Sequence, residues 1–294
     1  MDLCRFVPRS TLLSLALLLP VAATAQEAAP APVAAAAPAV TPAPGTGAPA
    51  VEPAMAVEAR LPAEAAQELI RQVDRQMAFA SDYKGIVRIM QKGKDGTSTL
   101  MQLHVYRRDS ANSFLLLITE PRNMAGGGYL RIGNNLWEYN VGLGQWMRTT
   151  RRANLVGTMA CEEDFDRSRL NEGYTAQDEG MEVINGRPYR KLLLTGRPDA
   201  EVTFPILRLW LDKDLHIVKR IGYAPSGRVL RTDIVRGYQR VKDPVSKNSV
   251  LHYREVYERE ESEGREMLVR YEDVHLAPLD PNIFTKSWLE GRMR

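Results

Sequence analysis

The hydrophobic positions of residues 61–81 repeat with the period of an α-helix. Apolar side chains recur there at spacings of three and four residues: Leu69, Ile70, Val73, Met77 and Ala80. Charged residues such as Arg71 and Asp74 occupy the opposite side of that helix. Pro62 suits a first helical position, because the N–H that it lacks would have no partner there. The pattern predicts one amphipathic helix that begins near Pro62 and ends near Ser81.

Beyond this helix the pattern changes to a period of two. In residues 206–212 three leucines alternate with other side chains, as expected of a strand with one covered face. Similar stretches are separated by turn residues such as Asn185 and Gly186. Sequential hairpins of this kind build an antiparallel sheet. We therefore expect an α+β fold that is mostly antiparallel β, with about eleven strands in a large, curved sheet and few helices.

The first 25 residues have the three parts of a cleavable signal peptide. Arg5 and Arg9 supply positive charge, residues 12–21 form an apolar run, and small residues at Ala23 and Ala25 offer a cleavage site. The run is shorter than the roughly 20 residues that a spanning helix needs. The pattern predicts export, with residues 1–25 removed.

Composition then divides the rest of the chain in two. Residues 26–60 consist largely of alanine, proline and valine, which offer few large side chains to bury and block regular hydrogen bonding. We expect a disordered linker over 26–60 and one folded domain over 61–294, a length that supports a sizeable core.

Charge and cysteine content exclude several classes of protein. The formal net charge is only +3, whereas a nucleic-acid-binding protein usually has a strong basic bias, so no nucleic acid is expected as a partner. Removal of the signal peptide leaves Cys161 as the single cysteine, so no intramolecular disulfide is expected. We interpret Cys161 as a small packed residue.

Motifs of catalysis or metal binding are not found in the sequence. The histidines are scattered and have no metal-ligand spacing: His104, His216, His252 and His275. Residues 126–128 are three glycines, but no Lys-Ser or Lys-Thr pair and no helix follow them. No nucleophile elbow is present either. We expect no catalytic residues, no metal and no cofactor, and therefore no enzyme.

The most specific motifs begin at Pro121. The sequence reads PRNMAGGGYLR from Pro121, LWEY over 136–139, QWMRTTRR over 145–152 and EDF over 163–165, and DPNIF follows over 280–284. In this order the motifs resemble those of the bacterial outer-membrane lipoprotein-sorting family, the LolA-like periplasmic carriers. The resemblance covers roughly residues 61–290. The three consecutive glycines and the long Ala/Pro tract depart from the family pattern.

The resemblance implies a strongly curved, half-open β-barrel with helices across its concave face. It also implies a periplasmic carrier that binds the acyl chains of lipoproteins or other lipids for sorting to the outer membrane. The partners would be lipoprotein or lipid cargo, an inner-membrane ABC or RND-type exporter and an outer-membrane acceptor. The alternative is a periplasmic sensor module, or an accessory subunit of an envelope transporter, without carriage.

Ten apolar residues are candidates for lining a lipid cavity: Leu69, Val73, Met77, Leu115, Leu117, Leu130, Ile132, Leu207, Leu209 and Leu211. The same alternation also describes an ordinary core, because a cavity and a core need the same apolar face. Arg148, Arg151 and Arg152 form a basic group. It would dock on an anionic lipid surface or an acidic partner, or else form a solvated edge that pairs with the acidic residues after it.

Overall fold

The computed structural model describes residues 59–151 and 153–293. The predicted signal peptide, and all of the predicted linker except its last two residues, lie outside the described residues. Among those that are described, no helix is both long and apolar enough to cross a bilayer.

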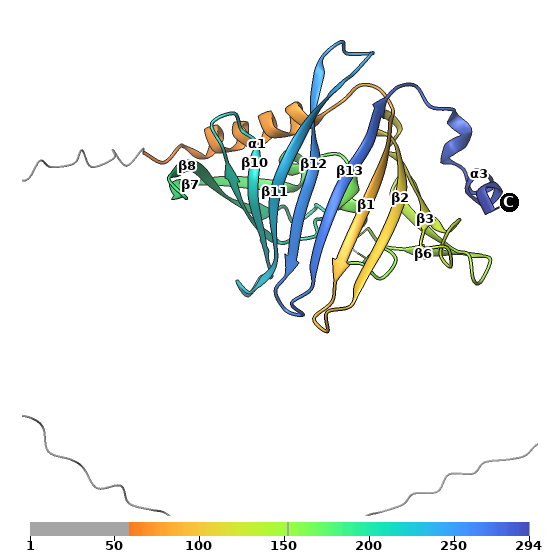
Figure 1. Ribbon diagram of the computed structural model, residues 1–294. Coiled ribbons are helices and arrows are strands. Elements are labelled where there is room, and N and C mark those ends of the chain that lie inside the picture. The colour runs from red at the N-terminus through yellow and green to blue at the C-terminus, as the bar shows by residue number, and fades with distance from the viewer. Residues whose placement is uncertain (1–58, 152, 294) are drawn as a thin grey trace, which may run out of the picture. The chain divides into compact units, whose positions relative to one another are not determined.

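The fold is one antiparallel sheet of thirteen strands (Figure 1). The strands are β1 (Tyr83–Lys92), β2 (Ser98–Arg108), β3 (Ser113–Glu120), β4 (Gly128–Ile132), β5 (Asn135–Asn140), β6 (Gln145–Thr149), β7 (Tyr174–Ile184), β8 (Arg187–Gly196), β9 (Ile206–Leu211), β10 (Ile217–Tyr223), β11 (Val229–Lys242), β12 (Ser249–Glu260) and β13 (Glu266–Leu276). The sheet is curved and not closed, which confirms the predicted half-open barrel, with thirteen strands in place of about eleven.

Helical segments are few and short, apart from the first. They are α1 (Ala63–Met77), η1 (Asp109–Ala111), η2 (Glu162–Phe165), α2 (Leu170–Gly173), η3 (Pro281–Phe284), α3 (Lys286–Glu290) and η4 (Gly291–Met293). The predicted amphipathic helix is α1, which buries Ala66, Ile70 and Val73 and follows Pro62.

Strand order explains how the sheet curves and where it stays open. Each strand pairs with its neighbour in the sequence, and β1 also pairs with β13, so that Tyr83 lies opposite Leu276. Asn185 and Gly186 both have positive φ in the β7–β8 turn, as a tight hairpin requires. The two edges of the sheet are β6 and β7, which follow one another in the chain without pairing. The barrel is therefore open between them.

The concave face of the sheet carries the main core. One cluster of buried residues gathers on β1, β2, β3 and β13 and includes Val87, Leu103 and Leu116. A second lies between α1 and strands β7 to β10 and includes Ile70 and Leu209. Val235 packs against both clusters, so the apolar surface is continuous along the inside of the sheet.

The chain between β6 and β7 crosses this concave side. We call residues 153–169 the crossing segment. Its apolar side chains Leu155, Met159, Ala160 and Phe165 belong to the core cluster of β1, β2, β3 and β13. They occupy space that a closed barrel would fill with side chains of opposing strands.

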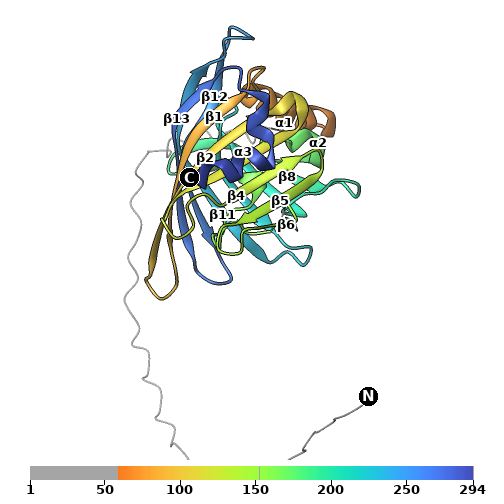
Figure 2. The same ribbon diagram turned by 90° about the vertical axis from the view of Figure 1, so that its right-hand side faces the viewer.

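The convex face is covered at one end by the C-terminal segment. Leu115, Leu117 and Leu130 point away from the crossing segment and pack with Ile283, Phe284 and Leu289. Figure 2 shows α3 lying over this side of the sheet, near β4 and β5.

Candidate functional site

The crossing segment meets the concave face through a run of four acidic residues. Glu162, Glu163 and Asp164 lie in η2, and Asp166 follows it. The turn is capped locally, since the Asp164 carboxylate accepts a hydrogen bond from the Cys161 amide at 2.9 Å. Glu162 and Asp166 point to one side of this turn, and Asp164 points to another group of arginines.

Arg131 of β4 binds two acids of the crossing segment, Glu162 and Asp166. Its guanidinium group donates to Asp166 at 2.8 and 3.0 Å and also to Glu162, and its side chain is only 1% exposed. Arg151 donates to the same two carboxylates, at 2.5 Å to Glu162 and 2.8 Å to Asp166. Arg169 adds a bond of 3.1 Å to Asp166. Three cations thus surround two acids in a largely buried cluster.

Arg231 of β11 binds Asp164, the acid of the crossing segment that points to the other group of arginines. It donates two parallel hydrogen bonds to Asp164, at 2.5 and 3.0 Å, the geometry that makes arginine–carboxylate pairs specific. Arg231 also lies 3.1 Å from Asp233 and 3.2 Å from Glu258. Arg220 of β10 pairs with Asp233 and reaches Asp164 at 3.3 Å. In this cluster three acids face two cations.

Burial has different outcomes for two acids of the second cluster. Burial raises the pKa of Glu258 to about 8, even though Arg231 opposes the shift. Asp164 is buried as well, which would raise its pKa, but the charge and hydrogen bonds of Arg231 lower the pKa of that carboxyl to about 2. At neutral pH Glu258 is therefore largely protonated, whereas Asp164 is ionised beside Arg231.

Helix α1 is tied to the end of the crossing segment by one carboxylate. Asp74 accepts hydrogen bonds from Ser168 at 2.5 Å, from the Leu170 amide at 3.1 Å and from the Asn171 amide at 2.7 Å. The two elements that cover the concave face are thus joined to each other by polar contacts, in addition to the apolar side chains that each packs against the sheet.

Two cavities lie beside these covering elements. A cavity of about 70 Å³ lies between α1, the crossing segment and the sheet, and Met77, Phe165 and Tyr253 are among its lining residues. A second, of about 230 Å³, lies beside Met159, Phe204 and Leu230. A dry cavity of 150 Å³ is known to hold one benzene molecule. The smaller cavity is therefore too small for an acyl chain in this conformation.

The predicted cavity residues fall into three groups. Leu69, Val73, Leu207, Leu209 and Leu211 come together between α1 and the sheet, and Met77 lines the smaller cavity. Leu115, Leu117 and Leu130 lie together on the convex face under the C-terminal segment. Ile132 is exposed. The structure thus brings six of the ten to the concave side of the sheet.

The predicted docking arginines are also separated. Arg148 is exposed and lies opposite Trp137 on β5. Arg151 lies in the buried cluster with Glu162 and Asp166. Arg152 lies outside the described residues. The local ion pairing that the sequence suggested is present, but it is made in the interior by Arg151.

Sequence reasoning did not single out Arg131, Arg231, Asp233 or Glu258. Each stands in a strand, where alternation suggests a polar residue turned to solvent. The signal that could have found them is charge balance, because an acidic run that sits in the core must meet arginines from several strands. Their distance from the run in the sequence hides that relation.

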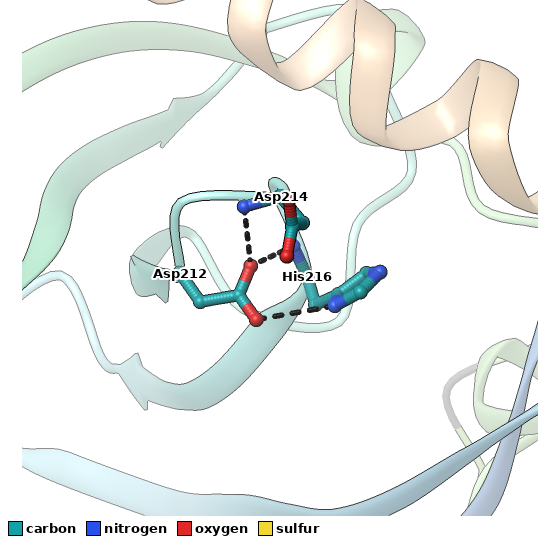
Figure 3. A group of neighbouring side chains, drawn as sticks. All are labelled: Asp212, Asp214 and His216. Atoms are coloured by element: carbon teal, nitrogen blue, oxygen red, sulfur yellow. Dashed lines mark hydrogen bonds and ion pairs between the residues drawn. The ribbon is translucent and has the colours of Figure 1, made fainter.

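In the described part of the chain, one group of metal-type side chains lies at the β9–β10 turn (Figure 3). Oxygen and nitrogen atoms of Asp212, Asp214 and His216 lie within 4.8 Å of one another. The Asp212 carboxylate accepts from the Asp214 and His216 amides at 2.9 Å each, and the His216 ring lies 3.1 Å from it. These bonds shape a tight turn, and we propose no metal there.

Solved structures share this fold. A LolA superfamily protein from Nitrosomonas europaea is 24% identical, with a TM-score of 0.64 over 76% of this chain and 98% of that one. A DUF1329 family protein from Desulfovibrio piger is 17% identical, with a TM-score of 0.67 over 78% and 99%. A putative outer membrane lipoprotein-sorting protein domain from Vibrio parahaemolyticus is 20% identical, with a TM-score of 0.65 over 78% and 100%. The shared architecture defines the fold class: an open, curved antiparallel sheet of the LolA type.

Sequence comparison adds a family model. A model described as an uncharacterized protein matches residues 110–291, more than half of the chain. No curated protein matches the chain. The chain belongs to the family that this model describes. Its fold is that of the LolA superfamily and lipoprotein-sorting structures, which confirms the resemblance in its motifs at the level of the fold.

Proposed function

We propose that this protein is a periplasmic carrier that binds the acyl chains of lipoproteins or other lipids for sorting to the outer membrane. The observation that carries the proposal is the continuous apolar surface on the inside of the sheet. It is covered by α1 and the crossing segment and not by a second sheet. Elements of this kind can move without unpairing any strand.

An acyl chain bound on the concave face would take the place of the apolar side chains that now cover that face. Leu155, Met159 and Phe165 of the crossing segment now fill that face. Each CH₂ group of a bound chain contributes about 0.8 kcal/mol when it is buried. Burial of a long acyl chain therefore offsets the exposure of the concave face when the segment withdraws.

Location and partners follow from the same proposal. The predicted signal peptide directs export, and the structural relative from Vibrio parahaemolyticus is described as a lipoprotein-sorting domain. A carrier in the periplasm would receive cargo from an inner-membrane exporter, of the ABC or RND type, and deliver it to an acceptor at the outer membrane.

A disulfide that holds the crossing segment in place tests the proposal. The Cys161 sulfur lies 3.6 Å from the Thr203 hydroxyl oxygen in the β8–β9 connection, so Thr203→Cys brings two thiols near bonding distance. In the mature protein, from which Cys4 is removed with the predicted signal peptide, the oxidised variant should lose binding of a fluorescent fatty acid. Reduction with dithiothreitol should restore it.

The reduced variant is the matched control, because it has the same sequence without the cross-link. Native mass spectrometry of gently purified wild type should also show bound lipid. No lipid in the wild type, together with no fatty-acid binding by the reduced variant, would exclude a carrier.

A second candidate is a sensor or accessory subunit without carriage. The buried ion pairs favour it, because they hold the crossing segment against the sheet from both clusters, and the cavity beneath is about 70 Å³. In that case neither redox form binds the fatty acid, and purification from membranes yields a stable complex with an inner-membrane protein.

A further inference from the structure

The convex face carries a group of aromatic and basic side chains that the proposed carrier function does not use. We call it the tryptophan patch. Its members lie on β1, β2, β5, β6 and the C-terminal segment: Lys84, Tyr106, Trp137, Trp146, Arg148, Lys286, Trp288 and Arg292. Three of the four tryptophans of the chain are among them.

Direct contacts hold one half of the patch together. The Lys286 ammonium lies 3.9 Å from the centre of the Trp137 ring and 5.2 Å from that of Trp146. The Trp146 indole N–H donates to the Glu290 carboxylate at 2.6 Å. Arg148 stands directly opposite Trp137 in the β5–β6 ladder. Helix α3 thus fixes two indole rings beside two cations.

The other half is built in the same way. The Arg292 guanidinium lies 4.2 Å from the centre of the Trp288 ring, which meets Tyr106 edge-on at 5.4 Å. The Lys84 ammonium lies 6.0 Å from the Tyr106 ring. Both cations lie at the surface, since Lys84 and Arg292 are exposed, and Trp288 is half-buried whereas Tyr106 is buried.

The cations of the patch are not neutralised. Within the described part of the chain, Lys84, Arg148, Lys286 and Arg292 form no salt bridge, whereas the arginines of the concave face are paired with carboxylates. The Glu290 carboxylate contacts the patch, where it accepts a hydrogen bond from the Trp146 indole N–H. With four cations and one carboxylate, the surface has a net positive charge.

Apolar side chains stand beside these cations. Ile132 is 51% exposed on the convex face next to the patch, and Leu143 is 61% exposed in the β5–β6 turn. Tryptophan beside lysine or arginine is the composition found where proteins meet the headgroup region of a bilayer, and anionic lipids attract unpaired basic residues. We propose that the tryptophan patch docks this protein on the anionic surface of a lipid bilayer.

Flotation with vesicles tests the docking directly. Wild type should float with vesicles of phosphatidylcholine and phosphatidylglycerol and should stay in solution with phosphatidylcholine alone. Binding should fall as salt is raised, because counterions screen exposed charges. Equal flotation with both kinds of vesicle, or with neither, would overturn the proposal.

Charge reversal assigns the docking to these residues. Arg148→Glu combined with Arg292→Glu should lower the vesicle partition coefficient by roughly 5-fold or more for each site. The matched control is Lys94→Glu combined with Arg228→Glu, which makes the same charge change at two exposed turns outside the patch. If the control lost binding to the same extent, total charge and not the patch would be responsible, and the proposal would fail.

Fluorescence reports the same contact in the unaltered chain. Brominated acyl chains in the vesicles should quench the tryptophan emission, because three indoles lie in the patch and only the buried Trp210 lies outside it. Absence of quenching in floated protein would contradict the proposal.

Two further outcomes separate this proposal from others. The oxidised Thr203→Cys variant should float as wild type does, since docking on the convex face does not need the concave face to open. Light scattering should show a monomer without lipid. If wild type were a dimer and the Arg148→Glu and Arg292→Glu changes dissociated it, the patch would bind a second copy of the chain. That result would overturn docking on a bilayer.

Discussion

Arg131 is an arginine in the core of the sheet, and its partners make its burial possible. It is 1% exposed and shares Glu162 and Asp166 with Arg151. A buried ion pair contributes little net stability, but removal of one partner leaves a carboxylate without a full set of donors. The role of Arg131 is therefore to keep the acidic crossing segment compatible with an apolar surface.

Substitution Arg131→Met should destabilise the protein by about 3 kcal/mol, because Asp166 would keep its charge in the core with weaker compensation. Urea unfolding measures the change. Arg148→Met is the control on the same part of the sheet, and as an exposed residue it should change the free energy of unfolding by less than about 0.5 kcal/mol. Similar values for both would mean that the cluster is not buried in solution.

Glu258 should make stability depend on pH near neutrality. Its folded pKa is raised by burial from 4.5 to about 8, so between these values the folded state holds a proton that the unfolded state has lost. The free energy of unfolding should fall as pH rises from about 5 to 8, by about 1.4 kcal/mol per pH unit at most. Urea titrations at a series of pH values measure this slope.

Glu258→Gln should remove this dependence, because the amide has the shape of the protonated acid and does not ionise. The difference in unfolding free energy between the variant and wild type should therefore grow in favour of the variant as pH rises. Parallel pH profiles for the two proteins would contradict a raised pKa.

At the scale of elements, two covering segments use opposite faces of the same strands. On β3, Phe114 and Leu116 face the crossing segment, whereas Leu115 and Leu117 face the C-terminal segment. The apolar run along β3 is continuous because both faces of this strand are covered. An apolar run such as that of residues 113–120 is typical of a strand, but its second cover depends on a segment about 170 residues later.

Leu289→Ala should loosen the C-terminal segment. Leu289 is fully buried with Phe284 and Leu130, and the loss of a buried leucine costs about 2–5 kcal/mol. Hydrogen exchange should show reduced protection over residues 281–293, with little change in β7 to β10. A uniform loss of protection over the whole sheet would show that this segment is not an independent unit.

At the scale of the whole molecule, the crossing segment joins the two edges of an open sheet. In the oxidised Thr203→Cys variant the cross-link between positions 161 and 203 would close a loop of about 40 residues, for which chain entropy predicts a gain of up to about 4 kcal/mol. Thermal and urea unfolding of the oxidised and reduced forms measure it. A lower stability of the oxidised form would indicate that positions 161 and 203 are farther apart in solution than in the structure.

The sequence by itself determined the local elements. The three- and four-residue spacing from Leu69 to Met77 predicted α1, and the alternation at residues 206–212 predicted β9. Asn185 and Gly186 predicted their hairpin turn. The motifs around Trp137 and Trp146 also indicated the family. These features depend on neighbours within a few residues, so the order of residues is enough to show them.

Only the tertiary structure decided which polar residues are inside. Asp164 and Arg231 are 67 residues apart and meet on the concave face, while Arg148 and Arg151, three residues apart, lie on different sides of the molecule. Trp137 and Lys286 meet only because the C-terminal segment returns to β5. The reason is that a period of two assigns a side chain to a face, but the curvature of the sheet and the path of the covering segments decide what that face meets.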